Sequence, residues 1–204
     1  MNADFRIDGK VIETERLILR PFRQTDLEDF YEYASIEGVG ENAGWKHHGN
    51  LGQHRTKIVH VLRSQIFRQI VQRGRRKAVA LLGRIVQYDG KDVSKTCAKS
   101  RKWSLCGVAL SKSYWGKGLM PEAVNAVIDY LFNELGFDFL ICGYYEFNER
   151  SKRVQLKCGF KPYRSLVMDT QLGTKEQGVL CLLINPDKNI ELKFSHQESL
   201  IYNK

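Results

Sequence analysis

The feature that most constrains this chain is an apolar strand, a lysine between two glycines and an amphipathic helix in immediate succession. Residues 107–110 (GVAL) are typical of a short strand, and Gly116-Lys117-Gly118 follow as a turn. Residues 122–135 repeat apolar side chains at helical spacing. Pro121 suits a first helical turn, because its missing N–H would be unpaired there anyway, and Gly136 can end the helix. The pattern predicts a strand–turn–helix unit.

The turn in this unit has the composition of an anion-binding loop. The amides of Gly116 through Met120 can point into one concavity, since glycine permits the backbone angles that this requires. The helix N-terminus adds about half a positive charge and Lys117 adds a full one, which suits phosphate or pyrophosphate. An ordinary strand-to-helix turn fits the same residues. The spacing matches neither a Walker A loop nor the dinucleotide-binding fingerprint.

The remaining elements alternate between strands and helices, which predicts a mixed α/β (α+β) fold. A capping box is predicted at Thr25–Glu28, with the following helix burying Leu27, Phe30, Tyr31 and Ala34. The other predicted strands span 14–20, 78–86, 137–145, 163–170 and 178–184, and the other predicted helices span 51–67 and 148–157. The last two strands form a hairpin that turns at Gly173.

Length and cysteine content predict a single intracellular domain. A chain of 204 residues with 43% hydrophobic content can bury a core without disulfides or metal. Its five cysteines show no C-x-x-C spacing, which indicates reduced thiols. MNADFRIDGK lacks the apolar region of a signal peptide, and no run approaches 18 apolar residues, so we expect a cytoplasmic protein without a membrane span.

The positive charge is concentrated in one segment. The chain carries a net charge of +9, yet residues 47–106 hold 14 Lys and Arg against only Asp89 and Asp92. The other residues hold 18 basic and 21 acidic side chains, so they are mildly acidic. His47, His48, His54 and His60 lie in or beside this segment, but their spacing and the absence of suitably spaced partners predict no metal site.

Four motifs occur in order along the chain: TERLILRPF from residue 14, GENAGWKHH at 40–48, SKSYWGKGLMPEAV at 111–124 and NERSKRVQLKCGF at 148–160. Together they resemble the GNAT N-acetyltransferases, and within them the branch that includes the ribosomal-protein N-acetyltransferases. The resemblance implies one acetyltransferase domain over 11–185 and a tail over 186–204. It also implies a mixed, mostly antiparallel central sheet flanked by helices, with acetyl-CoA between two strands that splay apart.

The same resemblance implies a cofactor site on the glycine turn. The family's pyrophosphate loop falls on residues 113–118, where Ser113 replaces the usual basic or amide residue. Asn148 matches the asparagine that contacts the cofactor. The cofactor-binding residues expected on this basis are Leu110, Trp115, Gly116, Lys117, Gly118, Leu119, Met120 and Asn148.

For catalysis the resemblance supplies one residue and leaves another to inference. Ser151 matches the serine proposed in some relatives to protonate the departing thiolate. Leu105 occupies the position of a glutamate that can serve as base in related enzymes, and Gln155 that of the superfamily's tyrosine acid. Glu146 is the nearest alternative base in sequence. No metal is expected.

Residues 50–106 should hold the family's helix and two strands, but their character is atypical, and three interpretations stay open. Arg73, Arg75, Arg76 and Lys77, then Lys99, Arg101 and Lys102 beside Trp103, could form a nucleic-acid arm. The segment could simply have diverged. It could also have been translated in a shifted frame, because codons for residues 79–83 such as GTG GCT CTA TTG GGA, read two nucleotides later, encode the family's Gly-Ser-Ile-Gly.

The expected function is transfer of an acetyl group from acetyl-CoA to a primary amine, either a protein N-terminus or a small molecule. A non-catalytic CoA-binding protein is the alternative that the missing glutamate favours. An RNA- or ribosome-associated module is a third class, although nucleic acid is the less favoured partner. We expect a monomer or a homodimer.

Overall fold

The computed structural model describes residues 10–50, 52, 68–73, 78–82, 85–86, 102–105 and 108–188. The chain divides into two compact units. Residues 1–84 with 107–126 form the first unit, and residues 85–106 with 127–204 form the second. Each unit has its own sheet, with five strands among the described residues. The prediction of one domain over 11–185 with a separate tail stays a prediction.

The sheet of the first unit is antiparallel throughout. In sheet order its strands are β1 (Ile12–Glu13), β2 (Leu17–Pro21), β3 (Arg68–Gln72), β4 (Ala78–Leu82) and β7 (Val108–Leu110). Leu17 and Leu19 are both fully buried while Ile18 and Arg20 are partly exposed, as a period-two strand requires. The predicted strand over 14–20 is confirmed with a later start.

The capping box predicted at Thr25–Glu28 is wrong. A 3₁₀ turn spans Gln24–Asp26, and α1 (Leu27–Ala34) follows it, so Thr25 lies inside the turn. The carboxylate of Asp26 accepts a hydrogen bond from the Arg23 amide at 2.7 Å and forms an ion pair with Arg20 at 2.6 Å. Asp26 takes the place of Thr25 because its buried carboxylate pairs with the charged Arg20, which the neutral Thr25 hydroxyl would not neutralise.

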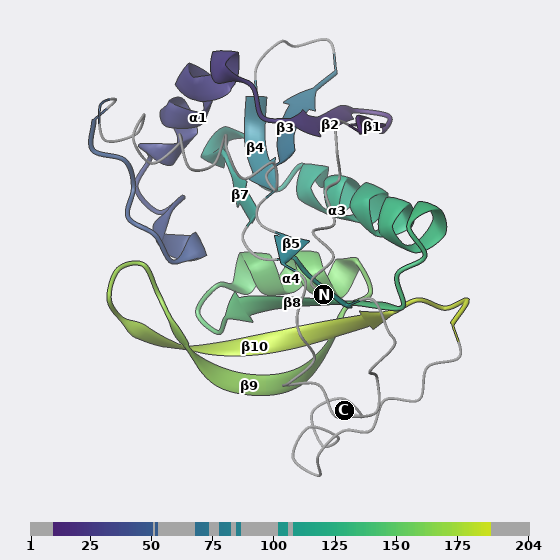
Figure 1. Cartoon of the computed structure of the whole chain (residues 1–204). Helices are drawn as coiled ribbons and strands as arrows, with labels where there is room; N and C mark the ends of the chain where they lie inside the picture. The colour runs from purple at the N-terminus through teal and green to yellow at the C-terminus, as the bar shows by residue number, and fades with distance from the viewer. Residues whose placement is uncertain are drawn as a thin grey trace, which may run out of the picture. The chain divides into compact units, whose positions relative to one another are not determined.

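The buried face of α1 differs from the prediction at three residues. Phe30, Tyr33 and Ala34 are buried, whereas Leu27 and Tyr31 are only partly covered. The three buried residues pack with Val39 and with Ala109 of β7 in one cluster. The helix also packs against β4 (Figure 1). The cluster therefore ties the N-terminal helix to the strand that leads into the glycine turn.

The central helix begins earlier than predicted. Helix α3 spans Leu119–Asp129, so Pro121 is its third residue, and a π-helical turn over Tyr130–Glu134 continues it. A helix can accommodate Pro here because the first residues have no intrahelical partner for their N–H groups. Gly136 has φ +66° and ends the run, as predicted.

The sheet of the second unit contains one parallel pair. In sheet order its strands are β5 (Ile85–Val86), β6 (Lys102–Leu105), β8 (Phe139–Tyr145), β10 (Lys175–Ile184) and β9 (Lys161–Asp169). β6 and β8 are parallel, and the other neighbours are antiparallel. β9 and β10 form the long hairpin coloured green to yellow in Figure 1, with Gly173 at φ +80° in its turn. Both hairpin strands are longer than predicted.

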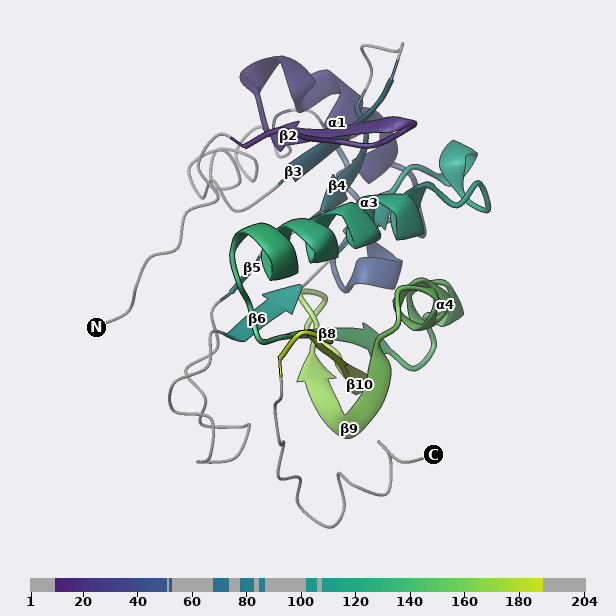
Figure 2. The same cartoon turned by 90° about the vertical axis from the view of Figure 1, so that its right-hand side faces the viewer.

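Helix α4 (Glu149–Lys157) packs against β8, as Figure 2 shows with α4 almost end-on. Asn148 caps it by accepting a hydrogen bond from the Ser151 amide at 3.0 Å. Gly159, at φ +85°, follows the C-terminus of the helix. The helix predicted over 148–157 is confirmed.

The basic segment supplies strands to both sheets. The single strand predicted over 78–86 is wrong, because β4 pairs with β3 and β7 whereas β5 pairs with β6. Gly83, a residue that weakens strand interiors, lies between the two strands in the sequence. Other predictions fall outside the described residues: the helix over 51–67 apart from Gly52, the cations at 75–77, 99 and 101, and His54 and His60.

Candidate functional site

The glycine turn in the first unit has the backbone that an anion-binding loop requires. Gly116 has φ +76° and Gly118 has φ +74°, which side-chain-bearing residues rarely adopt. Gly116, Lys117 and Gly118 are exposed. A Cβ atom added at Gly116 would meet no other atom within 4 Å, so a ligand can approach the backbone there.

The side chains beside this turn hold it in place. The indole N–H of Trp115 donates to the Leu110 carbonyl at 2.7 Å and so closes the segment between β7 and the turn. Leu119 and Met120 are buried, with 3% and 5% exposure, so they anchor the start of α3. The Lys117 ammonium lies 5.1 Å from the centre of the Tyr114 ring. The expected cofactor residues from Leu110 to Met120 thus form one anchored stretch with an exposed cationic tip.

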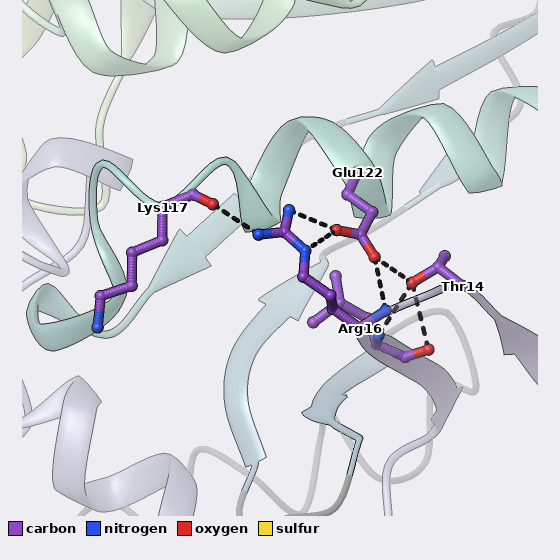
Figure 3. Close-up of polar contacts among 5 residues, drawn as sticks. Thr14, Arg16, Lys117 and Glu122 are labelled. Carbon is purple, nitrogen blue, oxygen red and sulfur yellow. Dashed lines mark hydrogen bonds and ion pairs between the residues drawn. The ribbon is translucent and has the colours of Figure 1, made fainter.

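A polar network of Thr14, Arg16 and Glu122, which contacts the glycine turn, was not predicted from the sequence (Figure 3). The Arg16 guanidinium donates to the Lys117 carbonyl at 3.0 Å and to the Glu122 carboxylate at 2.6 Å. The same carboxylate accepts from the Thr14 hydroxyl at 2.5 Å and from the Arg16 amide at 3.0 Å. TERL at 14–17 matched a family motif, but nothing in the sequence indicated that it contacts a residue 106 positions away.

This network keeps Glu122 ionised. Partial burial acts to raise the pKa of Glu122, but hydrogen bonds from the Thr14 hydroxyl and from the Arg16 amide and guanidinium lower the pKa below its ordinary value. The guanidinium of Arg16 therefore faces a full negative charge at neutral pH. Lys117 is left as the exposed cation at the tip of the turn.

In the second unit the N-terminus of α4 holds Asn148 and Ser151. Besides the cap that Asn148 provides, Gln155 donates from its side-chain nitrogen to the Gly143 carbonyl at 2.8 Å and to the Ser151 hydroxyl at 3.2 Å. Gln155 is 8% exposed, and its side-chain oxygen has no hydrogen-bond partner among the residues that the structure describes. Ser151 is thus oriented by two residues of its own helix.

The other proposed catalytic residue is less constrained. Glu146 is exposed just after β8, and its amide donates to the Gln177 carbonyl at 2.9 Å. Leu105, at the position of the family's glutamate, lies opposite Cys142 in the parallel pair β6–β8. The assignment of Glu146 as base stays a prediction.

Burial keeps the side chains of Tyr144, Cys158 and Cys181 in the second unit neutral. Burial raises the pKa of Tyr144 to about 12, and it raises the pKa of Cys158 to about 11 and of Cys181 to about 12. Cys142, Cys158 and Cys181 are buried free thiols, whereas Cys97 and Cys106 lie outside the described residues. The raised pKa values make Cys158 and Cys181 poor nucleophiles.

A second polar cluster in the first unit surrounds Glu41. Its carboxylate accepts from the Gly38 amide at 2.7 Å, and from the amide and ring of His47 at 3.1 and 2.7 Å.

Across the described ranges, no three His, Cys, Asp or Glu side chains gather as a metal site would need. The helices in those ranges include none that is long and apolar enough to cross a membrane.

Comparisons with known proteins identify the family and the fold. The model of the acetyltransferase (GNAT) domain family matches residues 16–161, and so includes the basic segment. Among curated proteins of Bacillus subtilis (strain 168), the probable N-acetyltransferase YjcK is 35% identical over 40% of this chain, an alignment that spans 45% of YjcK. The uncharacterized N-acetyltransferase YoaA is 26% identical over 74% of this chain and 82% of YoaA.

Solved structures share the fold at low sequence identity. A GNAT-family acetyltransferase from Bacillus anthracis has a TM-score of 0.73 at 19% identity, covering 87% of this chain and all of that one. Spermidine N-acetyltransferase from Vibrio cholerae, solved with CoA and spermine, has a TM-score of 0.63 at 14% identity, covering 84% and 97%. The predicted mixed fold is confirmed, and the extent of the family match shows that the chain belongs to the GNAT acetyltransferase domain family.

Proposed function

We propose that this chain transfers the acetyl group of acetyl-CoA to a primary amine by direct attack, without a metal or a covalent enzyme intermediate. The observation that carries the proposal is the exposed Gly116–Gly118 turn at the start of α3. Its positive φ angles, its unobstructed backbone and the cationic Lys117 suit the pyrophosphate of CoA.

The family resemblance assigns the chemical step to residues at the start of α4. Asn148 is the expected cofactor contact at the start of α4. The amine nitrogen forms a bond to the thioester carbonyl carbon and loses a proton, and the carbon–sulfur bond then breaks. Ser151 donates its hydroxyl proton to the departing thiolate and regains a proton from water, and a backbone amide stabilises the negative charge that develops on the carbonyl oxygen.

The amine must be neutral to attack, which bears on the class of acceptor. An α-amine has a pKa of about 8, whereas a lysine amine has one of about 10.4, so an α-amine loses its proton more readily. Glu146 is proposed as the base that accepts this proton. The Vibrio cholerae spermidine N-acetyltransferase acts on a polyamine, which keeps small polyamines beside protein N-termini as candidate acceptors.

The proposal is tested with the purified full chain in two steps. Calorimetric titration with CoA measures binding, and a thiol reagent then measures CoA release from acetyl-CoA across a panel of N-terminal peptides, polyamines and amino acids. We expect binding together with amine-dependent thiol release. A cytoplasmic location and a monomeric or homodimeric state are part of the proposal, to be checked by fractionation and by light scattering.

Two other outcomes would redirect the assignment. Binding of CoA without thiol release on any amine would favour a non-catalytic CoA-binding protein, the alternative that the missing glutamate at position 105 favours. Salt-sensitive RNA binding that CoA does not affect would favour the RNA-associated class.

A further inference from the structure

The network of Thr14, Arg16 and Glu122 contacts the glycine turn at one atom, the Lys117 carbonyl oxygen. Arg16 Nη1 donates to this oxygen at 3.0 Å, while its Nε and Nη2 atoms bond Glu122 at 2.6 and 2.5 Å. All of these residues belong to the first unit. The planar guanidinium therefore joins two rigid groups, the first turn of α3 and the peptide between Lys117 and Gly118 (Figure 3).

That contact fixes an orientation. The Lys117–Gly118 peptide is trans, so its C=O and its N–H point in opposite directions. Because Arg16 holds the carbonyl, the Gly118 N–H points away from Arg16. Gly118 also sits against the guanidinium, since a Cβ atom added there would lie 3.6 Å from Arg16 Nη2.

The network fixes the position of the Arg16 side chain and adds little net charge beside the turn. Glu122 neutralises Arg16 and is itself held by the Thr14 hydroxyl and the Arg16 amide, so each partner is fixed by a third. The side chain of Arg16 is 44% exposed, so its ion pair with Glu122 adds less to folding stability than a buried pair would. The hydrogen bond to the Lys117 carbonyl gives the arginine a role in the geometry of the turn.

We propose that Arg16, held by Glu122 and Thr14, is a positioning residue that presents the Gly118 amide to the pyrophosphate of CoA. This inference rests on the proposed function of the turn. It goes further in assigning to the N-terminal TERL motif a role in affinity for the nucleotide part of the co-substrate. Lys117 supplies the charge, and Arg16 supplies the direction of the backbone donor.

The test compares two ligands that differ by the nucleotide. The full chain is titrated with CoA and, separately, with pantetheine, which has the thiol arm but no pyrophosphate. Arg16→Lys keeps the charge but offers a single ammonium that does not span Glu122 and the Lys117 carbonyl together. We expect the Kd for CoA to rise about tenfold, as the loss of a charge-assisted hydrogen bond would cause, and the Kd for pantetheine to stay within about twofold.

Two further variants make the result specific. Glu122→Gln leaves Arg16 in place without its counter-charge and should weaken CoA binding several-fold, with no additional loss in the double variant. Glu13→Gln is the matched control, because Glu13 forms an exposed ion pair with Arg73 that does not involve the turn. It should bind both ligands as the unmodified protein does. Thermal unfolding of every variant confirms that it is folded.

The possible results distinguish failure of the positioning role from failure of the proposed function. Equal loss for CoA and pantetheine, or no loss for either, in the folded Arg16→Lys and Glu122→Gln variants would overturn the positioning role. Failure of the unmodified protein to bind CoA would instead overturn the proposed function, and the positioning role with it. If Arg16→Lys does not fold, Glu122→Gln decides alone.

Discussion

The side-chain nitrogen of Gln155 lies 2.8 Å from the Gly143 carbonyl oxygen and 3.2 Å from the Ser151 hydroxyl oxygen. A carbonyl only accepts hydrogen bonds, so the amide nitrogen of Gln155 must face Gly143, and its orientation is fixed. The Ser151 hydroxyl then accepts from Gln155, which leaves its own proton to donate elsewhere. Gln155, which the resemblance aligns with the superfamily's tyrosine acid, thus orients the hydroxyl of Ser151, the proposed proton donor.

Replacing Gln155 should therefore impair the chemical step. In Gln155→Met, the Ser151 hydroxyl loses the donor that directs it, and we expect kcat to fall about tenfold with the Kd for CoA unchanged. The effect should disappear in a Ser151→Ala background, because the residue being oriented is then missing. Steady-state kinetics with the best acceptor found measures both. Leu156→Ala, on the exposed side of the same helix, is the control and should keep the full kcat.

A left-handed backbone at Gly118 predicts a second, ligand-specific effect. Gly118→Ala forces a side chain into φ +74°, which costs about 1–2 kcal/mol of strain, or moves the backbone away from it. Either response misdirects the amide, so we expect CoA binding to weaken about tenfold or more by calorimetry. Gly173→Ala is the matched control, since Gly173 has φ +80° in the β9–β10 turn with no atom near an added Cβ. It should lower the Tm similarly and leave CoA binding intact, and equal binding losses would contradict the prediction.

Lys117 should contribute through charge. Lys117→Gln keeps an extended polar side chain but removes the cation at the tip of the turn, so CoA should bind several-fold more weakly and with a shallower dependence on salt. Titrations between about 0.05 and 0.5 M NaCl measure the slope. Lys175→Gln removes a cation that pairs with Asp169 on the β9–β10 hairpin and should leave slope and affinity unchanged. An unchanged slope in Lys117→Gln would show that the ammonium does not meet the phosphates.

Local patterns allowed much of this structure to be predicted from the sequence. The alternation at Leu17 and Leu19, the glycines at 116 and 118 and the helix from about residue 148 depend on neighbours within a few residues, and each is confirmed. The contact between Arg16 and Glu122 could not be predicted, because it joins residues 106 positions apart, and nothing in the motif around either residue indicates the other as its partner.

Two errors have the same physical origin. Thr25 satisfied the local rule for a cap, but Asp26 is held by Arg20 and Arg23, and that ion pair moved the helix start. Residues 78–86 satisfied the local rule for one strand, but their partners belong to two different sheets. In both cases partners that the local rule does not consider outweighed propensity.

The lowered pKa of Glu41 predicts how the stability of the first unit depends on pH. Burial acts to raise the pKa of Glu41, but hydrogen bonds from the amide and ring of His47 and from the Gly38 amide outweigh it and lower the pKa to about 2. A carboxyl with a depressed pKa stabilises the folded state above its ordinary value of 4.5, and that contribution is lost as the pH falls towards about 2.

Urea denaturation at pH 7, 5, 4 and 3 should therefore show a falling free energy of unfolding below about pH 5. Glu41→Gln should be less stable at pH 7, because the Gly38 and His47 amides lose a charged acceptor, and its profile should be flatter below pH 5. Glu28→Gln changes an exposed carboxylate of α1 and should keep the profile of the unmodified protein. The interpretation fails if Glu41→Gln loses stability on acidification as steeply as the unmodified protein, since the titrating group would then lie elsewhere.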